Sequence, residues 1–328
     1  MKPLKLIATV AASAALASSA MAAGGAEHAH PPEEGWAFEG AFGEFDEGSL
    51  QRGYQVYREV CASCHSMKLM SYRNLSERGG PFYSADYPAN ENPLVKAFAA
   101  EAEIFKGYDE YGDEVYGPAT AADRFPSPFS NENAARAANG GALPPDLSVI
   151  TKARHGGASY VYSLLSGYPD WEEVDLDGNI TFPRETSHGS SHGDGDHGGE
   201  ESHDGEDAHH GDSHDEPHGL LAQPIGQYYN PYFPGDTTPQ WTGDPRHIPA
   251  GGFLAMAPPL ADGQVTYLDG TEATVEQMAA DVAHFLAWAG EPKQEIRKST
   301  GLKTIIFLTV FAILLWLSYH QIWEKVEH

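Results

Sequence analysis

The sequence contains 328 residues, of which 41% are hydrophobic and 20% charged, so it has the composition of a folded protein and not of a disordered one. Its 47 acidic residues outnumber its 20 basic residues, and the formal net charge of -27 disfavours binding to nucleic acid or to an anionic lipid surface. The same charge favours a basic partner, because the field of the protein would steer such a partner toward it.

The first segment, residues 1–22, has the features of a signal peptide. Two lysines precede an apolar run rich in Ala and Ser, and Ala-Met-Ala at its end supplies the small-residue pattern that signal peptidase reads. A short buried or membrane-spanning N-terminal helix is the alternative, which the shortness of the run disfavours. The sequence therefore predicts export to the periplasm and a mature chain that begins near Ala23.

Residues 23–290 are predicted to form one mostly α domain with long loops. A lead-in rich in Gly, Pro and Glu is expected over residues 27–48, with aromatic side chains that could attach it to the folded body. Apolar residues then recur at helical spacing over residues 50–61. Between residues 81 and 145, short helical patterns alternate with Pro and Gly, and no period-two run is long enough to predict a sheet.

Two further helices and one insert are predicted in the second half of this domain. Ser159 to Leu165 has helical spacing, and Thr274-Val-Glu-Gln277 has the pattern of a capping box that opens a helix with an apolar stripe. Residues 186–219 consist mainly of His, Asp, Glu, Gly and Ser, and have little to bury. We expect a mobile insert there. Its histidines could bind zinc or copper, although a solvated acidic spacer is the simpler interpretation.

A second apolar run, residues 302–323, is predicted to be a transmembrane anchor. As a helix it would span roughly 30 Å at about 1.5 Å per residue, and three aromatic residues gather at its far end like an interfacial belt. Lys and Arg flank its near end, which the positive-inside rule would place in the cytoplasm. The signal peptide places that end outside, and we follow the signal because the cofactor attachment described next occurs outside. Residues 324–328 are then a cytoplasmic tail.

Cys61-Ala-Ser-Cys64-His65 matches C-x-x-C-H, the signature of covalent haem attachment. Helical residues three and four apart share a face, so both thiols can reach the haem vinyl groups while His65 lies beneath the iron. The alternatives are a thioredoxin-like redox pair, half of a zinc site and a plain disulfide. A redox pair would need a strand–helix context, and zinc would need two further ligands although the chain has no other cysteine. The motif therefore predicts one haem c.

The sixth iron position is predicted to be filled by a methionine, which raises the reduction potential relative to a second imidazole. Met67 and Met70 follow His65 too closely to reach the opposite haem face, and Met278 lies on a helix stripe where core packing is the simpler interpretation. Elimination favours Met256, which glycines precede and Pro-Pro follows. Taken alone, Met256 fits the core equally well.

Five motifs resemble, in content and in order, those of the cytochrome c1 family, the haem subunits of the cytochrome bc1 complex. The likeness extends from Trp36 to the C-terminus, and several motifs are more specific than C-x-x-C-H. They are Phe45–Met67, Ala142–Ser148, Lys152–Gly157, Tyr229–Gly235 and Met256–Pro259.

The resemblance implies a role for each matching residue. It implies that Cys61 and Cys64 carry the thioether bonds and that His65 and Met256 are the axial ligands of the haem iron. It also implies two further contacts with the haem, a propionate held by Arg154 and Tyr160 and packing by Pro144 and Pro145. From the residues alone, an Arg in this position is more often an ordinary surface residue than a ligand-binding one. The chain lacks cysteines for the extra disulfide of some bacterial relatives, and its segments 167–227 and 236–251 are longer than in many.

The resemblance further implies an electron-transfer subunit of quinol–cytochrome c reductase, with no bond-making chemistry on this chain. Single electrons would pass from a Rieske iron–sulfur protein to a basic c-type cytochrome, beside cytochrome b, in a dimeric complex of the inner membrane with the haem domain in the periplasm. One alternative is the haem subunit of a terminal oxidase or nitric oxide reductase. Another is a periplasmic metal-buffering protein that uses the His-rich insert.

Overall fold

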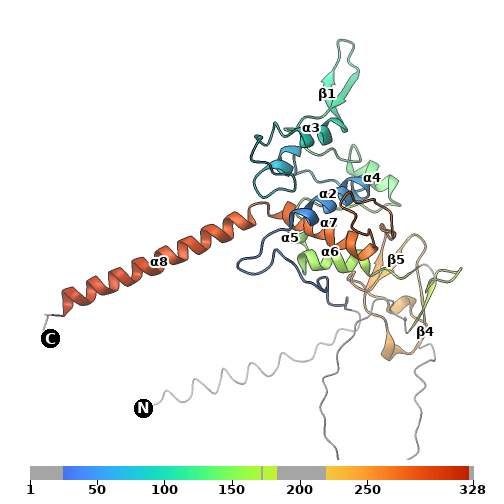
Figure 1. The fold of residues 1–328 in the computed structure, drawn as a ribbon. Helices are drawn as coiled ribbons and strands as arrows, with labels where there is room; N and C mark the ends of the chain where they lie inside the picture. Colours follow the sequence, from blue (N-terminus) through green and yellow to red (C-terminus); the bar gives the residue numbers. More distant parts are fainter. Residues whose placement is uncertain (1–24, 171–172, 183–218, 325–328) are drawn as a thin grey trace, which may run out of the picture. The chain divides into compact units, whose positions relative to one another are not determined.

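The computed structural model describes residues 25–170, 173–182 and 219–324. The described residues fall into two compact units: a larger one within His28–Tyr168 and Ala255–His328, and a smaller one within Pro169–Leu254 together with the described residues up to Glu27. The larger unit is mostly helical, as the sequence predicts (Figure 1). The predicted signal peptide and the insert 186–219, apart from its last residue, lie outside the described residues, so both stay predictions.

The larger unit is built on two crossing helices, α2 (Glu47–Glu59) and α7 (Val275–Gly290). Gly53 allows the close approach, because a Cβ at this position would lie 2.0 Å from the Asp281 carbonyl oxygen. Tyr54 and Tyr57 pack on Phe285, with ring centroids 5.7 and 6.0 Å apart. The apolar stripe predicted for α7 is buried throughout: Met278, Val282, Phe285, Leu286 and Ala289.

A buried ion pair joins the same two helices. The Asp281 side chain is 1% exposed and accepts hydrogen bonds from Arg52 Nε at 2.9 Å and from Gln277 Nε2 at 2.9 Å. Thr274 caps α7 by accepting from the Gln277 N–H at 3.2 Å. Only this half of the predicted capping box forms. The Gln277 side chain binds Asp281 instead, because a buried carboxylate without enough partners is costly.

The predicted attachment of the lead-in is confirmed for its first two aromatic residues. Trp36 and Phe38 are buried, and Trp36 Nε1 donates to Ser159 Oγ of α6 (Gly157–Ser166) at 2.9 Å. Phe42, in contrast, is 78% exposed. The Trp36 ring also meets the Tyr162 ring edge to face, with centroids 6.2 Å apart, so two segments more than 120 residues apart in the sequence are joined by a hydrogen bond and an aromatic contact.

His284 of α7 is enclosed by this lead-in. Its ring meets those of Phe38 and Phe45 at centroid distances of 5.0 and 5.5 Å, and its Nε2 accepts from the Asp46 N–H at 3.1 Å. Burial lowers the pKa of His284 to about 4, while the Asp46 carboxylate opposes this shift more weakly. The imidazole is therefore neutral in the folded protein at neutral pH.

We expect the folded protein to lose stability as the pH falls from about 6.5 to about 4. In this window the unfolded chain binds a proton at His284 that the folded chain does not, so up to about 3 kcal/mol of stability disappears. In His284→Gln, whose amide oxygen can still accept from Asp46, the loss should be smaller by that amount. Thermal unfolding in detergent at several pH values measures it, with His155→Gln, at an exposed position, as the control. A pH dependence that is identical in all three proteins would contradict the assignment.

Short helices and one hairpin complete the body of the larger unit. The predicted helix at 159–165 is confirmed as α6. The prediction that residues 81–145 contain no sheet is wrong, because β1 (Glu103–Tyr108) and β2 (Glu114–Pro118) form an antiparallel hairpin. Both faces of this hairpin are largely exposed, so neither strand shows the alternation that reveals a half-buried strand. The remaining helices are α3 (Pro93–Ala100), α4 (Glu132–Ala138) and α5 (Ile150–Ala153).

The smaller unit contains two antiparallel strand pairs. β3 (Asn179–Phe182) pairs with β4 (Gly219–Ala222), and β5 (Tyr228–Asn230) pairs with β6 (Gly252–Leu254). The Tyr229 hydroxyl donates to the Ala250 carbonyl at 2.6 Å. A Cβ on Gly235 would lie 2.7 Å from the Gly252 Cα, so this glycine lets two backbone segments touch. The Tyr-Asn-Pro-Tyr-Phe-Pro-Gly motif is thus a packing element that ends beside β6.

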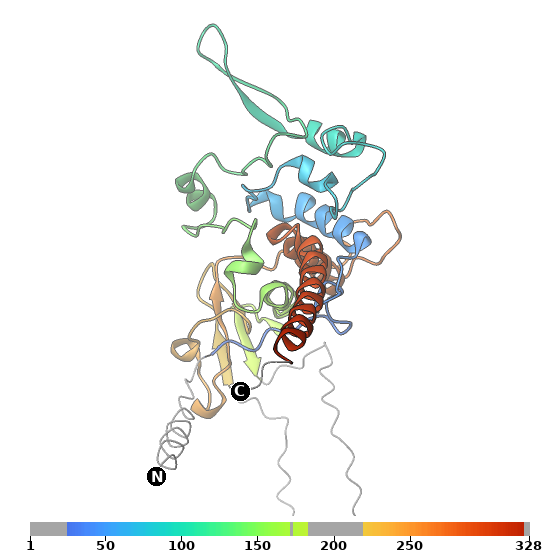
Figure 2. The ribbon, with the colours of Figure 1, turned by 90° about the vertical axis from the view of Figure 1, so that its left-hand side faces the viewer.

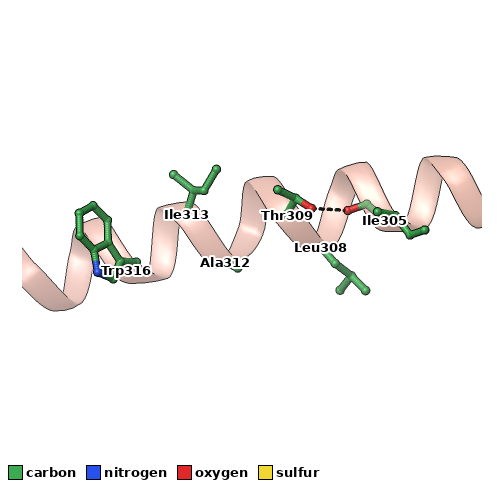
Figure 3. Close-up of a pocket in the computed structure, with 6 residues that line it drawn as sticks. All are labelled: Ile305, Leu308, Thr309, Ala312, Ile313 and Trp316. Atoms are coloured by element: carbon green, nitrogen blue, oxygen red, sulfur yellow. Dashed lines mark hydrogen bonds between the residues drawn. The ribbon is translucent and has the colours of Figure 1, made fainter. Parts of the chain in front are cut away.

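Helix α8 (Gln294–Trp323) contains the predicted anchor and is long and apolar enough to cross a membrane. Figure 3 shows apolar side chains projecting from several sides of this single helix, and the Thr309 hydroxyl donating to the Ile305 carbonyl at 2.9 Å. The polar hydroxyl is therefore satisfied within the helix, as a lipid environment requires. At the other end of α8, Lys298 Nζ donates to the carbonyls of Phe38 (2.6 Å) and Gly43 (3.0 Å). This flanking lysine thus has a structural partner in the lead-in.

Candidate functional site

Cys61 begins a 3₁₀ turn, Cys61–Ser63, that follows α2, and Cys64 is the residue that caps the end of this turn. The sequence analysis placed the motif on the helix itself, but α2 ends at Glu59. The helical spacing persists, because the N–H groups of Cys64 and His65 both donate to the Cys61 carbonyl, at 3.1 and 2.9 Å. Both cysteines are free thiols, so this structure contains no disulfide between them.

The surroundings of the thiols do not suit the other two alternatives. Burial raises the pKa of the Cys61 thiol to about 12, whereas the reactive thiol of a redox pair has a lowered pKa. Within the described residues, no group of three His, Cys, Asp or Glu side chains could hold a metal ion, so the pair has no further zinc ligands there. Thioether attachment needs neither a thiolate of low pKa nor a third ligand.

His65 presents one ring nitrogen for coordination. Its Nδ1 lies 2.8 Å from the Pro145 carbonyl oxygen, and because a carbonyl only accepts, Nδ1 carries the proton. Nε2 is then the nitrogen with a free lone pair. Burial lowers the pKa of His65, which the Pro145 carbonyl partly opposes, so the imidazole is neutral. A backbone carbonyl that fixes the tautomer and the ring orientation is typical of metal-binding histidines.

Asp146 fastens the segment that carries Pro145 to the segment that carries His65. Its Oδ2 accepts from Ser66 Oγ at 2.7 Å and from the Lys68 N–H at 2.9 Å. Burial alone would raise the pKa of Asp146, but hydrogen bonds from Ser148, Lys68 and Ser66 hold it below the usual value. Sequence reasoning missed this residue, although a carboxylate two positions before a serine is a common local bonding pattern.

Arg154 and Tyr160 lie on either side of a tight turn between α5 and α6. Gly156 has φ +87°, and a Cβ there would lie 3.2 Å from the Tyr160 Cβ, so the turn requires glycine. Arg154 is exposed and Tyr160 is half-buried. Burial raises the pKa of Tyr160, and the charge of the nearby Arg154 guanidinium opposes that shift. The structure therefore brings together the two side chains expected to hold a propionate.

Met256 lies in an extended segment outside the hydrophobic core. It is half-buried, and its carbonyl accepts from the Tyr168 hydroxyl at 2.9 Å. Met67, Met70 and Met278 belong to the hydrophobic core and are no more than 3% exposed. Among these four methionines, Met256 alone stands outside the hydrophobic core.

One continuous segment contacts both candidate ligands. It begins at Pro145, which holds His65, and ends at Tyr168, which holds the backbone of Met256. Between them lie α5, the glycine turn and α6. The residues present suit a haem c: two adjacent free thiols, an imidazole oriented through Nδ1 and a methionine outside the core.

The comparisons with known proteins all point to the same family. The model of the Cytochrome C1 family matches residues 36–326. A protein named cytochrome c1 from Rhodospirillum rubrum is 39% identical over 318 residues, 95% of this chain and 96% of that protein. The Candida albicans cytochrome b-c1 complex catalytic subunit, mitochondrial, is 38% identical over 305 residues, 92% of this chain and 81% of that protein.

A larger relative contains a region similar to this chain. The protein named cytochrome b/c1 from Bradyrhizobium diazoefficiens is 40% identical over 293 residues, which cover 89% of this chain. The chain spans only 35% of the length of that protein.

Proposed function

The chain belongs to the cytochrome c1 family, and from this membership we propose that it carries one covalently bound haem c and passes single electrons from a Rieske iron–sulfur protein to a basic c-type cytochrome. As a cytochrome c1 it is the electron-transfer haem subunit of the cytochrome bc1 complex. Quinol chemistry belongs to another subunit of that complex. The haem supplies a one-electron ferrous–ferric couple, and the chain sets its potential and its surroundings.

The His65–Pro145 contact is the observation that carries this proposal. Cys61 and Cys64 would attach the haem, and His65 would hold its iron through Nε2. The Pro145 carbonyl holds the imidazole in one tautomer and one orientation, which a reversible one-electron carrier needs to keep its coordination unchanged between oxidation states. Asp146 supports this arrangement by joining the two backbone segments.

Met256 is proposed as the distal ligand, with its loop positioned through the Tyr168 hydroxyl. A thioether in this place favours the ferrous state and suits a high-potential carrier. Arg154 and Tyr160 are proposed to bind a haem propionate, for which a guanidinium provides charge-assisted hydrogen bonds. Pro144 and Pro145 are proposed to pack against the haem.

The cellular arrangement follows from the anchor and from the relatives. Helix α8 makes the protein membrane-anchored, and we propose a single pass of the inner membrane with the haem domain on the periplasmic side. The relative named cytochrome b/c1 supports an association with cytochrome b. A dimeric complex is proposed from family membership. The metal-buffering alternative has no support within the described residues, and most of its candidate segment lies outside them.

We expect Cys64→Ala to bind haem without a complete covalent link, and Cys61→Ala/Cys64→Ala to lose covalent haem altogether. Haem staining after denaturing electrophoresis and the haemochrome spectrum in pyridine measure the attachment, because only a thioether survives denaturation. Ser63→Ala, within the same turn, is the control and should keep full staining. Equal haem staining of the double cysteine variant and of the unaltered protein would contradict covalent haem attachment, on which the proposed function rests.

A further inference from the structure

The lead-in, drawn in dark blue, passes beside the beginning of helix α8 in both Figure 1 and Figure 2. Gln294 Nε2 and Lys298 Nζ both donate to the Phe38 carbonyl, at 2.8 and 2.6 Å. Lys298 Nζ also donates to the Gly43 carbonyl at 3.0 Å. The beginning of α8 therefore holds both ends of the segment Glu39–Gly43, which we call the lead-in loop.

The lead-in loop is bound at the level where the bilayer begins. Lys298 precedes Leu302, the first residue of the apolar run, by four residues, or about 6 Å at about 1.5 Å per residue. The polar layer on each side of the hydrocarbon core of a bilayer is roughly 5–8 Å thick. Because the loop is bound to Lys298, it lies within this polar layer when α8 spans the membrane.

A large apolar side chain stands near the tip of the lead-in loop. Phe42 is 78% exposed, whereas Trp36 and Phe38 of the same lead-in are buried in the core. Gly43 permits the tight reversal of the loop, because a Cβ at this position would overlap the Glu39 carbonyl oxygen. Single exposed apolar side chains are common on protein surfaces, so the place of Phe42 beside the anchor is the informative observation.

Backbone groups on both sides of the tip already have hydrogen-bond partners, which a less polar environment requires. Besides the two carbonyls bound by α8, the Phe45 N–H donates to Glu295 Oε1 at 2.8 Å. The Glu39 N–H donates to the Trp36 carbonyl at 3.0 Å. Contact with lipid would therefore remove the Phe42 ring from water and leave these four backbone groups paired.

The charges near the tip suit a zwitterionic lipid surface. Glu39 and Glu44 flank the tip, and both are exposed. Lys293 and Lys303, also exposed, lie in the adjoining part of the chain around the start of the anchor. A phosphatidylcholine headgroup has charges of both signs and can meet both sets, whereas an anionic headgroup would repel the two glutamates.

We propose that the lead-in loop is a second membrane contact, in which Phe42 inserts into the interfacial layer of zwitterionic lipid beside the anchor. An apolar aromatic ring at this depth is stabilised by removal of its surface from water. Lys298 couples the loop to α8, so the haem domain is held to the bilayer at two points and not by one helix alone. This inference rests on the proposed membrane crossing by α8 and goes beyond the proposed electron transfer.

A photoreactive side chain at position 42 tests the contact. Phe42→p-benzoyl-phenylalanine is made in the full chain, which is reconstituted in phosphatidylcholine nanodiscs, irradiated and analysed by mass spectrometry for a lipid adduct. The same probe at Phe307, in α8, is the positive control, and at Tyr111, 81% exposed in the β1–β2 hairpin, the negative control. We expect the adduct yield at position 42 to be within about threefold of that at Phe307 and at least about tenfold above that at Tyr111.

Two lysine variants of the chain with the probe at position 42 test the coupling to α8. Lys298→Met removes both hydrogen bonds to the loop but keeps an unbranched aliphatic chain. Lys303→Met makes the same chemical change at an exposed position further along the helix. We expect Lys298→Met to lower the lipid adduct at least about threefold, and Lys303→Met to leave it within about 1.5-fold of the parent yield.

Three results would overturn the second membrane contact. One is a yield at position 42 no higher than at Tyr111, which would show that the ring stays in water. Another is an adduct with a second polypeptide in place of lipid when the irradiation is repeated in native membranes, which would assign the loop to packing between subunits. The third is an equal yield in the two lysine variants.

The Phe307 control separates failure of the loop from failure of the anchor. A chain without a lipid adduct at Phe307 would contradict the membrane crossing by α8, and the second contact would fall with it. A chain with the adduct at Phe307 but not at position 42 would overturn the second contact alone. These yields do not depend on haem, so the proposed electron transfer is judged separately by the haem staining of the cysteine variants.

Discussion

Met256→Leu is expected to keep covalent haem but to lower the midpoint potential by an amount on the order of hundreds of millivolts, because leucine cannot donate a sulfur lone pair to the iron. The thioether-to-iron charge-transfer band of the oxidised protein should disappear at the same time. An optical redox titration of the membrane protein in detergent measures both. The loop itself should stay in place, since Tyr168 binds the carbonyl of residue 256 and not its side chain.

The matched controls are Met70→Leu and Met278→Leu, which make the same chemical change in the hydrophobic core. Leucine and methionine have similar volumes, so these variants should lose less than about 1.5 kcal/mol of stability and keep the potential. If either control loses the charge-transfer band while Met256→Leu retains it, the sixth ligand lies elsewhere and the assignment to Met256 is wrong.

Gly53→Ala is expected to cause the largest loss of stability. Its Cβ would lie 2.0 Å from the Asp281 carbonyl oxygen and 2.7 Å from the Phe285 Cβ, so α2 and α7 must move apart. The separation would loosen the Arg52–Asp281 ion pair and the aromatic contacts around Phe285. We expect a loss of about 3 kcal/mol or more, measured as a fall of the thermal unfolding midpoint in detergent.

Gly48→Ala, in the first turn of the same helix, is the control. A Cβ there would meet only the ends of the Asp46 and Arg52 side chains, at 3.3 and 3.4 Å. Alanine is a better helix former than glycine, so this variant should unfold at the same temperature or higher. Equal destabilisation by the two substitutions would contradict the helix crossing as the cause, because helix propensity favours alanine at both positions.

The sequence predicted most reliably those elements whose pattern is local. Helix α6 and the buried stripe of α7 follow from the spacing of apolar residues, and α8 follows from a single long apolar run. The hairpin β1–β2 was missed because period-two alternation arises only when one face of a strand is buried. The capping box formed only in part, since a carboxylate one helical turn further along competed for the Gln277 side chain.

In the candidate site, too, the residues with a local sequence pattern could be predicted and the long-range contacts could not. Cys61, Cys64 and His65 are visible as a motif of five residues, whereas their support depends on contacts between distant segments. Asp146 is about 80 residues from Ser66, which it binds, and the Tyr168–Met256 contact spans 88 residues. No local pattern encodes either contact. The axial and propionate assignments stay proposals, and Met256→Leu tests the axial assignment to Met256.

Tyr168 binds the main chain of Met256 and not its side chain. The position of the loop and the proposed binding of the iron therefore depend on different atoms of this residue. The position of the loop depends on a backbone oxygen that every amino acid possesses, while the proposed coordination of the iron depends on the Met256 sulfur, which a single substitution removes. Evolution could therefore retune the driving force of electron transfer by exchanging one residue, without first having to rebuild the loop that carries it.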